Sequence, residues 1–139
     1  MKYLLDTCVI SELIKPVPND KVMSWIQNID ESQLYISVLT FGEIEKGIQK
    51  LTDGPKKVKL KLWLEVDLNQ RFENRIIPIN LDVAIKWGKI QAMSERTGRP
   101  LPAIDGLIAT SALVNNCVVV TRNTSDMEQS TAELFNPWE

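Results

Sequence analysis

Histidine is absent from this chain of 139 residues. Its absence excludes catalysis by an imidazole acid or base and by a Ser/His/Asp triad, and it leaves no histidine ligand for zinc or haem. Any catalytic chemistry therefore depends on other side chains, and the carboxylates are the first candidates.

Cysteine is also scarce, since only Cys8 and Cys117 occur, far apart and without a C-x-x-C spacing. Such a pair is typical of two buried thiols in a reducing compartment, so we expect a cytoplasmic protein. No apolar run approaches the roughly 20 residues that cross a bilayer. Because Asp6 interrupts the apolar N-terminal run, we expect a soluble protein without a secretion signal or a membrane contact.

Excess positive charge is lacking too, because the net charge is −2. This argues against a surface coated for non-specific binding of nucleic acid. The densest basic patch consists of Lys56, Lys57, Lys59 and Lys61. It is either a solvated helix face, which is the commoner case, or a strip that steers phosphates. The chain length and the 44% hydrophobic content fit one domain over residues 1–139.

Short apolar runs alternate with segments in which apolar residues recur at helical spacing. Strands are expected at residues 3–5, 34–38, 76–79, 117–121 and 133–136. Helices are expected at 9–14, from about 20, from 40 to about 53, from about 55 to 74, at 81–96 and at 103–116. This alternation, with a continuous apolar strand at 117–121, indicates a three-layer α/β sandwich around a mainly parallel sheet.

Four carboxylates stand where an apolar stretch gives way to a helix start or a tight turn: Asp6, Glu43, Asp105 and Asp126. Each has a structural alternative. Glu43 ends the segment Thr40-Phe41-Gly42-Glu43, which matches a capping box with Thr40 at the helix start. Asp6 and Asp126 are candidate helix caps, and the dipole favours Asp105 in the first turn of its helix. The apolar neighbours Ile104, Leu107, Ile108 and Ala112 indicate, however, that this helix is largely buried, where an unpaired Asp is costly.

The four acids share one chemical explanation. In a parallel α/β sheet the functional crevice lies beyond the C-terminal ends of the strands, where Asp6 and the turn carrying Asp126 fall. Carboxylates gathered there repel one another unless a hard cation such as Mg²⁺ or Mn²⁺ neutralises them. We expect Asp6 and Asp105 to bind the metal directly, with Glu43 and Asp126 acting through water. A metal held in this way activates water against a phosphodiester, which is nuclease chemistry.

Two other functions remain compatible with an acidic crevice. A small metal-dependent phosphatase follows the same logic, but its haloacid type needs an Asp-x-Asp pair, and Asp6-Thr7-Cys8 lacks the second acid. A catalytically silent adaptor would bind RNA or a protein without cleaving. Nucleotide-binding modules are disfavoured, because neither G-x-G-x-x-G nor G-x-x-x-x-G-K-[ST] occurs.

Five short motifs, taken in order, are more specific than any one of them. They are Leu5-Asp6-Thr7-Cys8-Val9-Ile10-Ser11-Glu12-Leu13, Glu43 on its helix, Ala103-Ile104-Asp105-Gly106-Leu107-Ile108-Ala109, Thr121-Arg122-Asn123 with Asp126, and Asn136-Pro137-Trp138. Over the whole chain they resemble PIN-domain ribonuclease toxins of type II toxin–antitoxin modules, of the VapC/FitB type. Met127 departs from that pattern, because the family commonly has an aromatic residue after the last acid. The departure puts the local packing in doubt, not the ligand set.

The resemblance implies a Mg²⁺- or Mn²⁺-dependent endoribonuclease that cleaves single-stranded or looped RNA with the four acids named above. It adds two auxiliary residues: Thr7, whose hydroxyl is expected to reach the metal or the scissile phosphate, and Asn123, whose amide is expected to support the pocket. It also implies a homodimer and a cognate antitoxin. The antitoxin would block the pocket, often with an arginine, while its DNA-binding part represses the shared operon.

Overall fold

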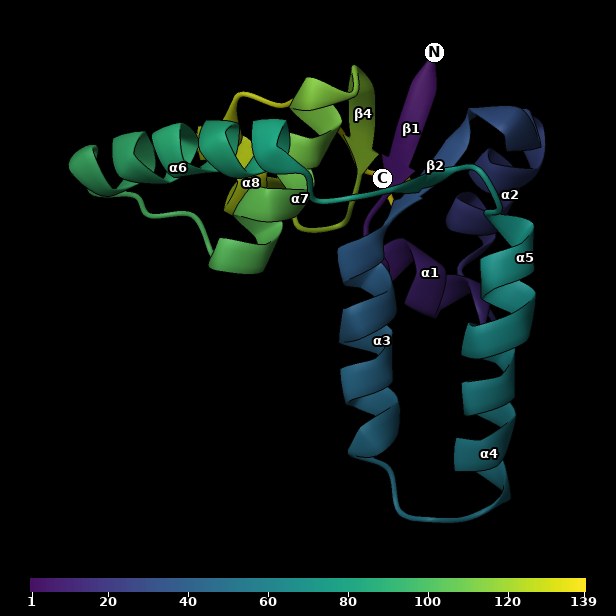
Figure 1. The fold of residues 1–139 in the computed structure, drawn as a ribbon. Helices are drawn as coiled ribbons and strands as arrows, with labels where there is room; N and C mark the ends of the chain where they lie inside the picture. Colours follow the sequence, from purple (N-terminus) through teal and green to yellow (C-terminus); the bar gives the residue numbers. More distant parts are fainter.

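Five short strands form one sheet in the order β3-β2-β1-β4-β5, and every neighbouring pair is parallel. The computed structural model describes all residues from 1 to 139. The strands are β1 (Lys2–Leu5), β2 (Leu34–Ser37), β3 (Ile76–Ile77), β4 (Cys117–Val120) and β5 (Leu134–Phe135). Figure 1 shows β1 at the centre, and Leu5 is in register with Ile36 of β2 and Val120 of β4.

Helices cover both faces of this sheet. They are α1 (Thr7–Leu13), α2 (Asp20–Asn28), α3 (Val38–Gln49), α4 (Pro55–Leu62), α5 (Asn69–Arg71), α6 (Leu81–Arg96), α7 (Ala103–Val114) and α8 (Thr124–Met127). Short 3₁₀ turns occupy Glu31–Gln33 and Glu128–Ser130. None of the helices is both long and apolar enough to span a bilayer.

The alternation of side chains along β1 divides the hydrophobic core into two parts. Leu5 faces the larger part, which includes Ile10 of α1 and Phe72 at the end of α5. Leu4 faces the smaller part, which includes Ile108 of α7. Because neighbouring residues of a strand point to opposite faces, one strand supports both cores. The predicted three-layer sandwich is confirmed, and its sheet is parallel throughout.

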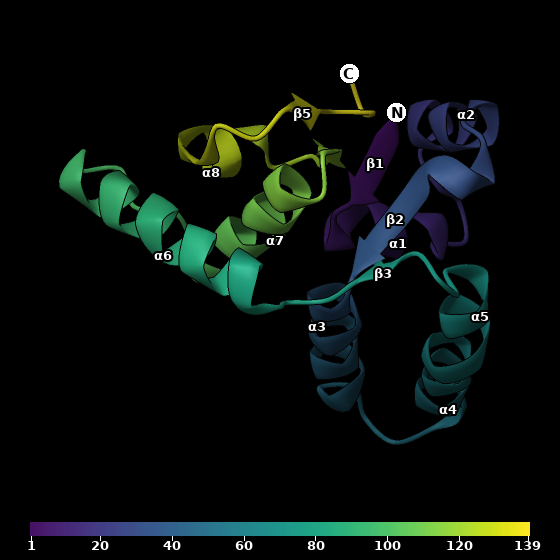
Figure 2. The ribbon, with the colours of Figure 1, turned by 45° about the horizontal axis from the view of Figure 1, so that its top comes forward.

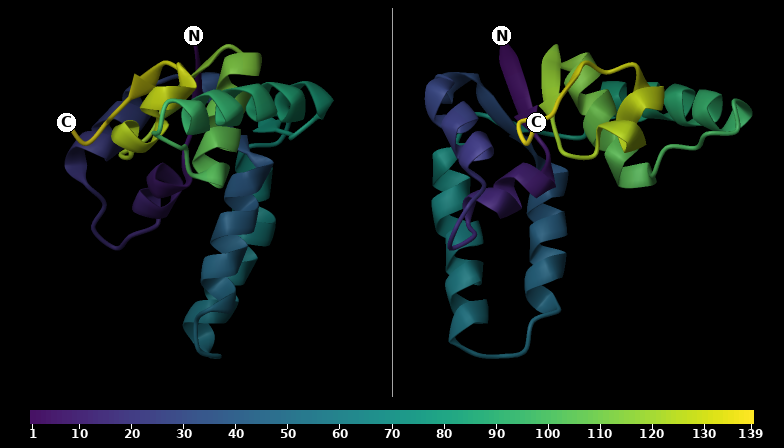
Figure 3. Two further views of the ribbon diagram at one scale, coloured as in Figure 1. Left: turned by 90° about the vertical axis from the view of Figure 1, so that its left-hand side faces the viewer. Right: turned by 180° about the vertical axis from the view of Figure 1, so that it is seen from behind.

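The helices divide into two groups on the two sides of the sheet. In Figures 1 and 2, α6, α7 and α8 lie on the side of β4 and β5, whereas α1 and α3 to α5 lie on the side of β2 and β3. The helix α3 and the run from α4 to α5 project side by side away from the sheet, as both views of Figure 3 show. The predicted acids come from both groups: Asp6 and Glu43 from the side of α1 and α3, and Asp105 and Asp126 from α7 and α8.

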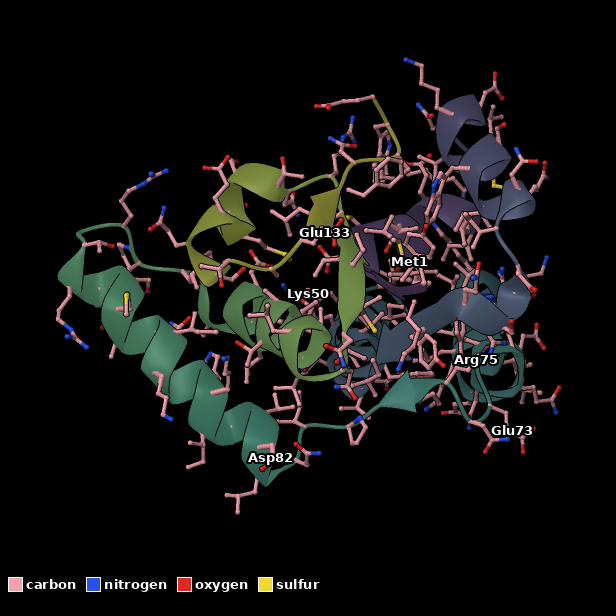
Figure 4. All side chains as sticks on the ribbon, turned by 90° about the horizontal axis from the view of Figure 1, so that it is seen from above. Met1, Lys50, Glu73, Arg75, Asp82 and Glu133 are labelled. Carbon is pink, nitrogen blue, oxygen red and sulfur yellow. The ribbon has the colours of Figure 1, made fainter.

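Arg75 fixes the loop between α5 and β3. Its guanidinium donates to the backbone carbonyl of Leu34 at 2.7 Å and to the Glu31 carboxylate at 3.1 Å, and it lies over the ring of Phe72. Figure 4 places Arg75 beside β3, at the outer edge of the sheet. These contacts join the start of β2 to the end of the helical run, so the edge strand β3 is anchored although it has only two residues.

Three expectations from sequence need correction. The helix predicted to open at Thr40 begins at Val38, because the Ser37 hydroxyl caps it by accepting from the N–H of Leu39 at 3.1 Å. The helix predicted from about 55 to 74 ends at Arg71 and contains a π-helical turn at Trp63–Leu68. Ile104, expected to be buried, is 39% exposed.

Candidate active site

Asp6 follows β1 directly, and only 4% of its surface is exposed. Its carboxylate accepts a hydrogen bond from the N–H of Thr7 at 2.8 Å and another from the Thr121 hydroxyl at 2.7 Å. The first bond caps α1, so capping and a role in the site are compatible here. Burial raises the pKa of the Asp6 carboxyl, and the hydrogen bond from Thr121 opposes that rise.

The sheet order places Asp6 at a topological switch point. From β1 the sheet extends through β2 and β3 on one side and through β4 and β5 on the other. In such sheets ligands bind beyond the C-terminal ends of the strands at this point. Thr121 follows β4, so its bond to Asp6 joins the ends of the two central strands. The sequence predicted the crevice but not this role of Thr121, whose partner lies 115 residues away.

Glu43 faces α1 across the crevice. Its Oε1 accepts a hydrogen bond from the Thr7 hydroxyl at 2.6 Å, and that hydroxyl lies 3.1 Å from the hydroxyl of Thr40. The capping box proposed for this segment is wrong, because Ser37 is the N-cap and Thr40 lies fully buried inside α3. The side chain of Glu43 is therefore directed at Thr7, the auxiliary residue, and not at its own helix end.

Asp105 lies in the first turn of α7, as the sequence predicted, and its helix has no side-chain cap. Burial, and after it the charges of Asp6, Asp126 and Glu43, together raise the pKa of this half-buried carboxyl to about 6. The charges of the other three predicted acids therefore all act on Asp105.

The start of α7 is held by α6. The hydroxyl of Ser94 accepts from the N–H of Leu101 at 3.2 Å, and the side-chain amide of Gln91 donates to the Leu101 carbonyl at 3.2 Å. Gln91 also packs against Gly106, where a Cβ atom would collide with its Oε1. These contacts set the position of the segment that carries Asp105. Sequence reasoning missed both α6 residues, since neither stands near any of the four predicted acids in the chain.

Asp126 and Asn123 lie in the turn from β4 into α8. The N–H of Asn123 donates to the Thr121 hydroxyl at 2.9 Å, and the N–H of Asp126 donates to the Asn123 carbonyl at 3.1 Å. The Asn123 side chain does not cap α8, and its predicted supporting role stays a prediction. Met127 is fully buried in the smaller core, where it fills the place at which the family pattern has an aromatic residue.

Cys8 is a further neighbour of Asp6 that the sequence did not single out. Its Sγ lies 3.7 Å from Asp6 Oδ2 and 3.7 Å from the Thr121 hydroxyl. Burial and the nearby Asp6 charge raise the pKa of this thiol, so it stays protonated at neutral pH. Both cysteines are free; Cys117 is buried as predicted, whereas Cys8 is only partly buried.

The donor set fits a hard cation that keeps part of its water shell. No three carboxylate or thiol side chains approach closely enough to surround an ion. The charges of the other three acids nevertheless contribute, after burial, to the raised pKa of Asp105. Both observations suit Mg²⁺, which is commonly held by one or two direct carboxylates and several waters. The available donors are oxygens, and no nitrogen base is present in the chain.

A hollow of about 530 Å³ contains none of the four acids. It lies between α3 and the π-helical turn and is lined partly by Val38, Phe41, Leu64 and Ile76. Its volume does not make it the site, because a site for a charged polymer needs polar and charged groups and this lining is mainly apolar.

Comparison with known proteins gives consistent matches over nearly the whole chain. The PIN domain family model matches residues 3–129. The chain is 35% identical over 135 residues to Toxin FitB of Neisseria gonorrhoeae, covering 97% of each protein. It is 32% identical over 136 residues to VapC ribonuclease Y4jK of Sinorhizobium fredii, covering 98% of this chain and 97% of that one. A structure of FitAB bound to an IR36 DNA fragment contains a chain that matches with a TM-score of 0.92 and 34% identity, covering 99% of this chain and 96% of that one.

Proposed function

This chain belongs to the PIN domain family, and from that premise we propose that it is the ribonuclease toxin of a type II toxin–antitoxin module. One observation carries the proposal: at the switch point of the sheet Thr7 links two of the acids, because its N–H donates to Asp6 and its hydroxyl donates to Glu43. The charges of Asp6, Asp126 and Glu43 also contribute to the raised pKa of Asp105. A protein of another function has no need to gather uncompensated negative charge there. The proposed domain is the whole chain, residues 1–139.

Within this site we propose Asp6 and Asp105 as direct ligands of Mg²⁺ or Mn²⁺, with Glu43 and Asp126 acting through water. Nucleases of the PIN family are generally metal-dependent. When bound, the ion would neutralise charge on the scissile phosphate and lower the pKa of a water molecule. The protein's own part is orientation: Thr7 and Thr121 hold the Asp6 carboxylate in one position.

The remaining polar groups have distinct proposed roles. Glu43 uses Oε1 to accept from Thr7 and keeps its other oxygen to orient an attacking water. The Thr7 hydroxyl, fixed by that bond, lies where it can approach the scissile phosphate. Asp105, with a pKa of about 6, is mostly ionised at neutral pH and so is ready to bind a cation. The Asn123 amide supports the turn that carries Asp126.

We propose RNA as substrate and an antitoxin protein as partner. Support comes from the relative named a VapC ribonuclease and from the FitAB structure, in which a similar chain is part of a complex bound to DNA. DNA would reach this chain only through the antitoxin. A homodimer and a cytoplasmic place of action complete the proposal, the latter because the substrate is RNA and both thiols are free.

Cleavage of a mixed cellular RNA pool tests this function. Purified protein is incubated with Mg²⁺, Mn²⁺ or EDTA, beside Asp105→Asn and the matched control Asp82→Asn. Asp82, like Asp105, stands in the first turn of its helix, and its charge does not act on the pKa of Asp105. Figure 4 shows it at the start of α6. Discrete cuts that need metal, persist in Asp82→Asn and vanish in Asp105→Asn support the proposal. Equal silence of all proteins with both metals would favour the silent adaptor.

A further inference from the structure

Two hollows border the acid site on the two sides of the sheet. The first, of about 260 Å³, lies among α1, α3 and α4, and its wall includes Thr7, Glu43 and Lys56. The second, of about 320 Å³, lies between the segment 99–102 and α8, and its wall includes Arg99 and Asp126. Each hollow thus combines one acid of the site with one basic side chain.

The basic side chains can offset the repulsion between the acids and a bound RNA strand. An RNA strand carries one phosphate per nucleotide, and a cation held by the acids neutralises only the phosphate that is cleaved. The neighbouring phosphates would otherwise meet four carboxylates. A basic side chain on each side of the acids removes that repulsion.

The two basic residues are available for such contacts. Lys56 is exposed and takes part in none of the ion pairs of the chain. Arg99 is exposed and pairs with Glu128 at 3.6 Å, but both side chains are more than half exposed. An ion pair of this kind contributes little stability, so a phosphate can replace the carboxylate at small cost.

The sequence left open whether the lysine patch of α4 contacts RNA, and the side chains differ in this respect. Lys57 is turned back to Asp53 and to the carbonyl of Leu51. Lys59 and Lys61 line neither hollow. Lys56 alone of the four borders the hollow that contains Glu43, so the patch as a whole is not the binding element.

We propose that Lys56 and Arg99 bind RNA phosphates on opposite sides of the cleavage site, so that one strand runs from the α3–α4 hollow, across the acids, to the hollow at segment 99–102. This inference rests on the proposed ribonuclease function. The first hollow has an aliphatic floor that includes Ile44, Ile48 and Leu60. Such a floor suits an unstacked nucleobase. This path between the two hollows, which we call the RNA track, therefore takes single-stranded RNA and not a duplex.

Steady-state cleavage of a short single-stranded RNA that contains one cut site tests the track. Lys56→Ala and Arg99→Ala are each expected to raise KM about threefold to tenfold with kcat unchanged, because they remove contacts remote from the reacting atoms. Each should also reduce the slope of log(kcat/KM) against log salt by about 0.7, the value for one phosphate of a single strand. The double variant should multiply the two effects, since the hollows lie on different sides of the sheet.

Lys59→Ala and Arg96→Ala serve as matched controls. Lys59 lies on α4 with Lys56, and Arg96 is the last residue of α6, shortly before Arg99. Each control removes one exposed basic side chain that lines neither hollow. Neither should change KM or the salt slope. Equal effects from controls and test variants would overturn the track and indicate a general charge effect.

A binding measurement separates this inference from the function on which it rests. Fluorescence anisotropy of the labelled RNA with Asp105→Asn protein needs no cleavage. Addition of Lys56→Ala or Arg99→Ala to the Asp105→Asn protein should weaken its binding of RNA, and this would support the track. A wild-type protein that cuts nothing would refute only the nuclease proposal. Unchanged binding in both backgrounds, or no binding by the parent protein, overturns the track.

Discussion

Replacement of Asp105 by Asn should make the metal-free protein more stable at neutral pH. The carboxyl is half-buried and repelled by three other acids, so ionising it in the folded state costs free energy. Asn has nearly the same shape and carries no charge. A substitution that removes a proposed metal ligand is therefore expected to stabilise the fold, the reverse of what loss of a structural ion pair would do.

The magnitude follows from the pKa. The value of about 6 in the folded protein lies about two units above the ordinary 3.8, and each unit corresponds to about 1.4 kcal/mol. This sets a ceiling of about 3 kcal/mol. Because the side chain is about half exposed and water screens its interactions, we expect about 1 kcal/mol, or about 3 °C in Tm.

The raised pKa also fixes how the stability difference between the two proteins changes with pH. A raised pKa in the folded state favours the protonated acid, so its contribution to stability is complete below pH 3.8 and is lost as the pH rises through about 6. The free energies of unfolding of wild type and Asp105→Asn should therefore differ little at about pH 4 and differ most above about pH 7. Addition of Mg²⁺ should stabilise the wild type and stabilise the variant much less.

Urea denaturation in EDTA at several pH values, followed by circular dichroism, measures the difference. The control Asp82→Asn removes an exposed carboxylate from the first turn of α6 and should give no gain in stability at neutral pH. A lower stability of Asp105→Asn at neutral pH, or a difference that does not depend on pH, would refute the electrostatic reasoning and make Asp105 a structural residue.

Three further substitutions test the structure around the site. Gly106→Ala should lower the free energy of unfolding in urea by about 1–3 kcal/mol, because the new methyl group collides with Gln91; an unchanged value would mean that the side chain moves aside freely. Thr121→Val leaves Oδ2 of the buried Asp6 with only the weak thiol donor of Cys8, so it should cost about 1–3 kcal/mol in the same assay and slow RNA cleavage. Normal cleavage would argue against the need to orient that carboxylate. Phe72→Ala empties a fully buried position and should cost about 3–5 kcal/mol without changing the metal requirement of cleavage; a changed requirement would link this core to the site.

The predictable parts of the fold are those with strong local signals. The helix expected at 81–96 is α6 with the same bounds, because Asn80 caps it and apolar residues follow at helical spacing. The run of valines after Cys117 is β4, since a strand buried on both faces is apolar at every position. The start of α3 was misplaced because Ser37 and Thr40 are both good caps, and only the end of β2 decides between them.

The sequence by itself determined the alternation of strands and helices and the lack of any imidazole chemistry, and it predicted the four candidate acids. These depend on residue type and on spacing along the chain, and both can be read locally. Only the tertiary structure decided which partners the side chains of these acids contact. The bond from Thr7 to Glu43 spans 36 residues and that from Thr121 to Asp6 spans 115. Such contacts, like the hollows beside Lys56 and Arg99, exist only once the parallel strands bring distant segments to one edge of the sheet.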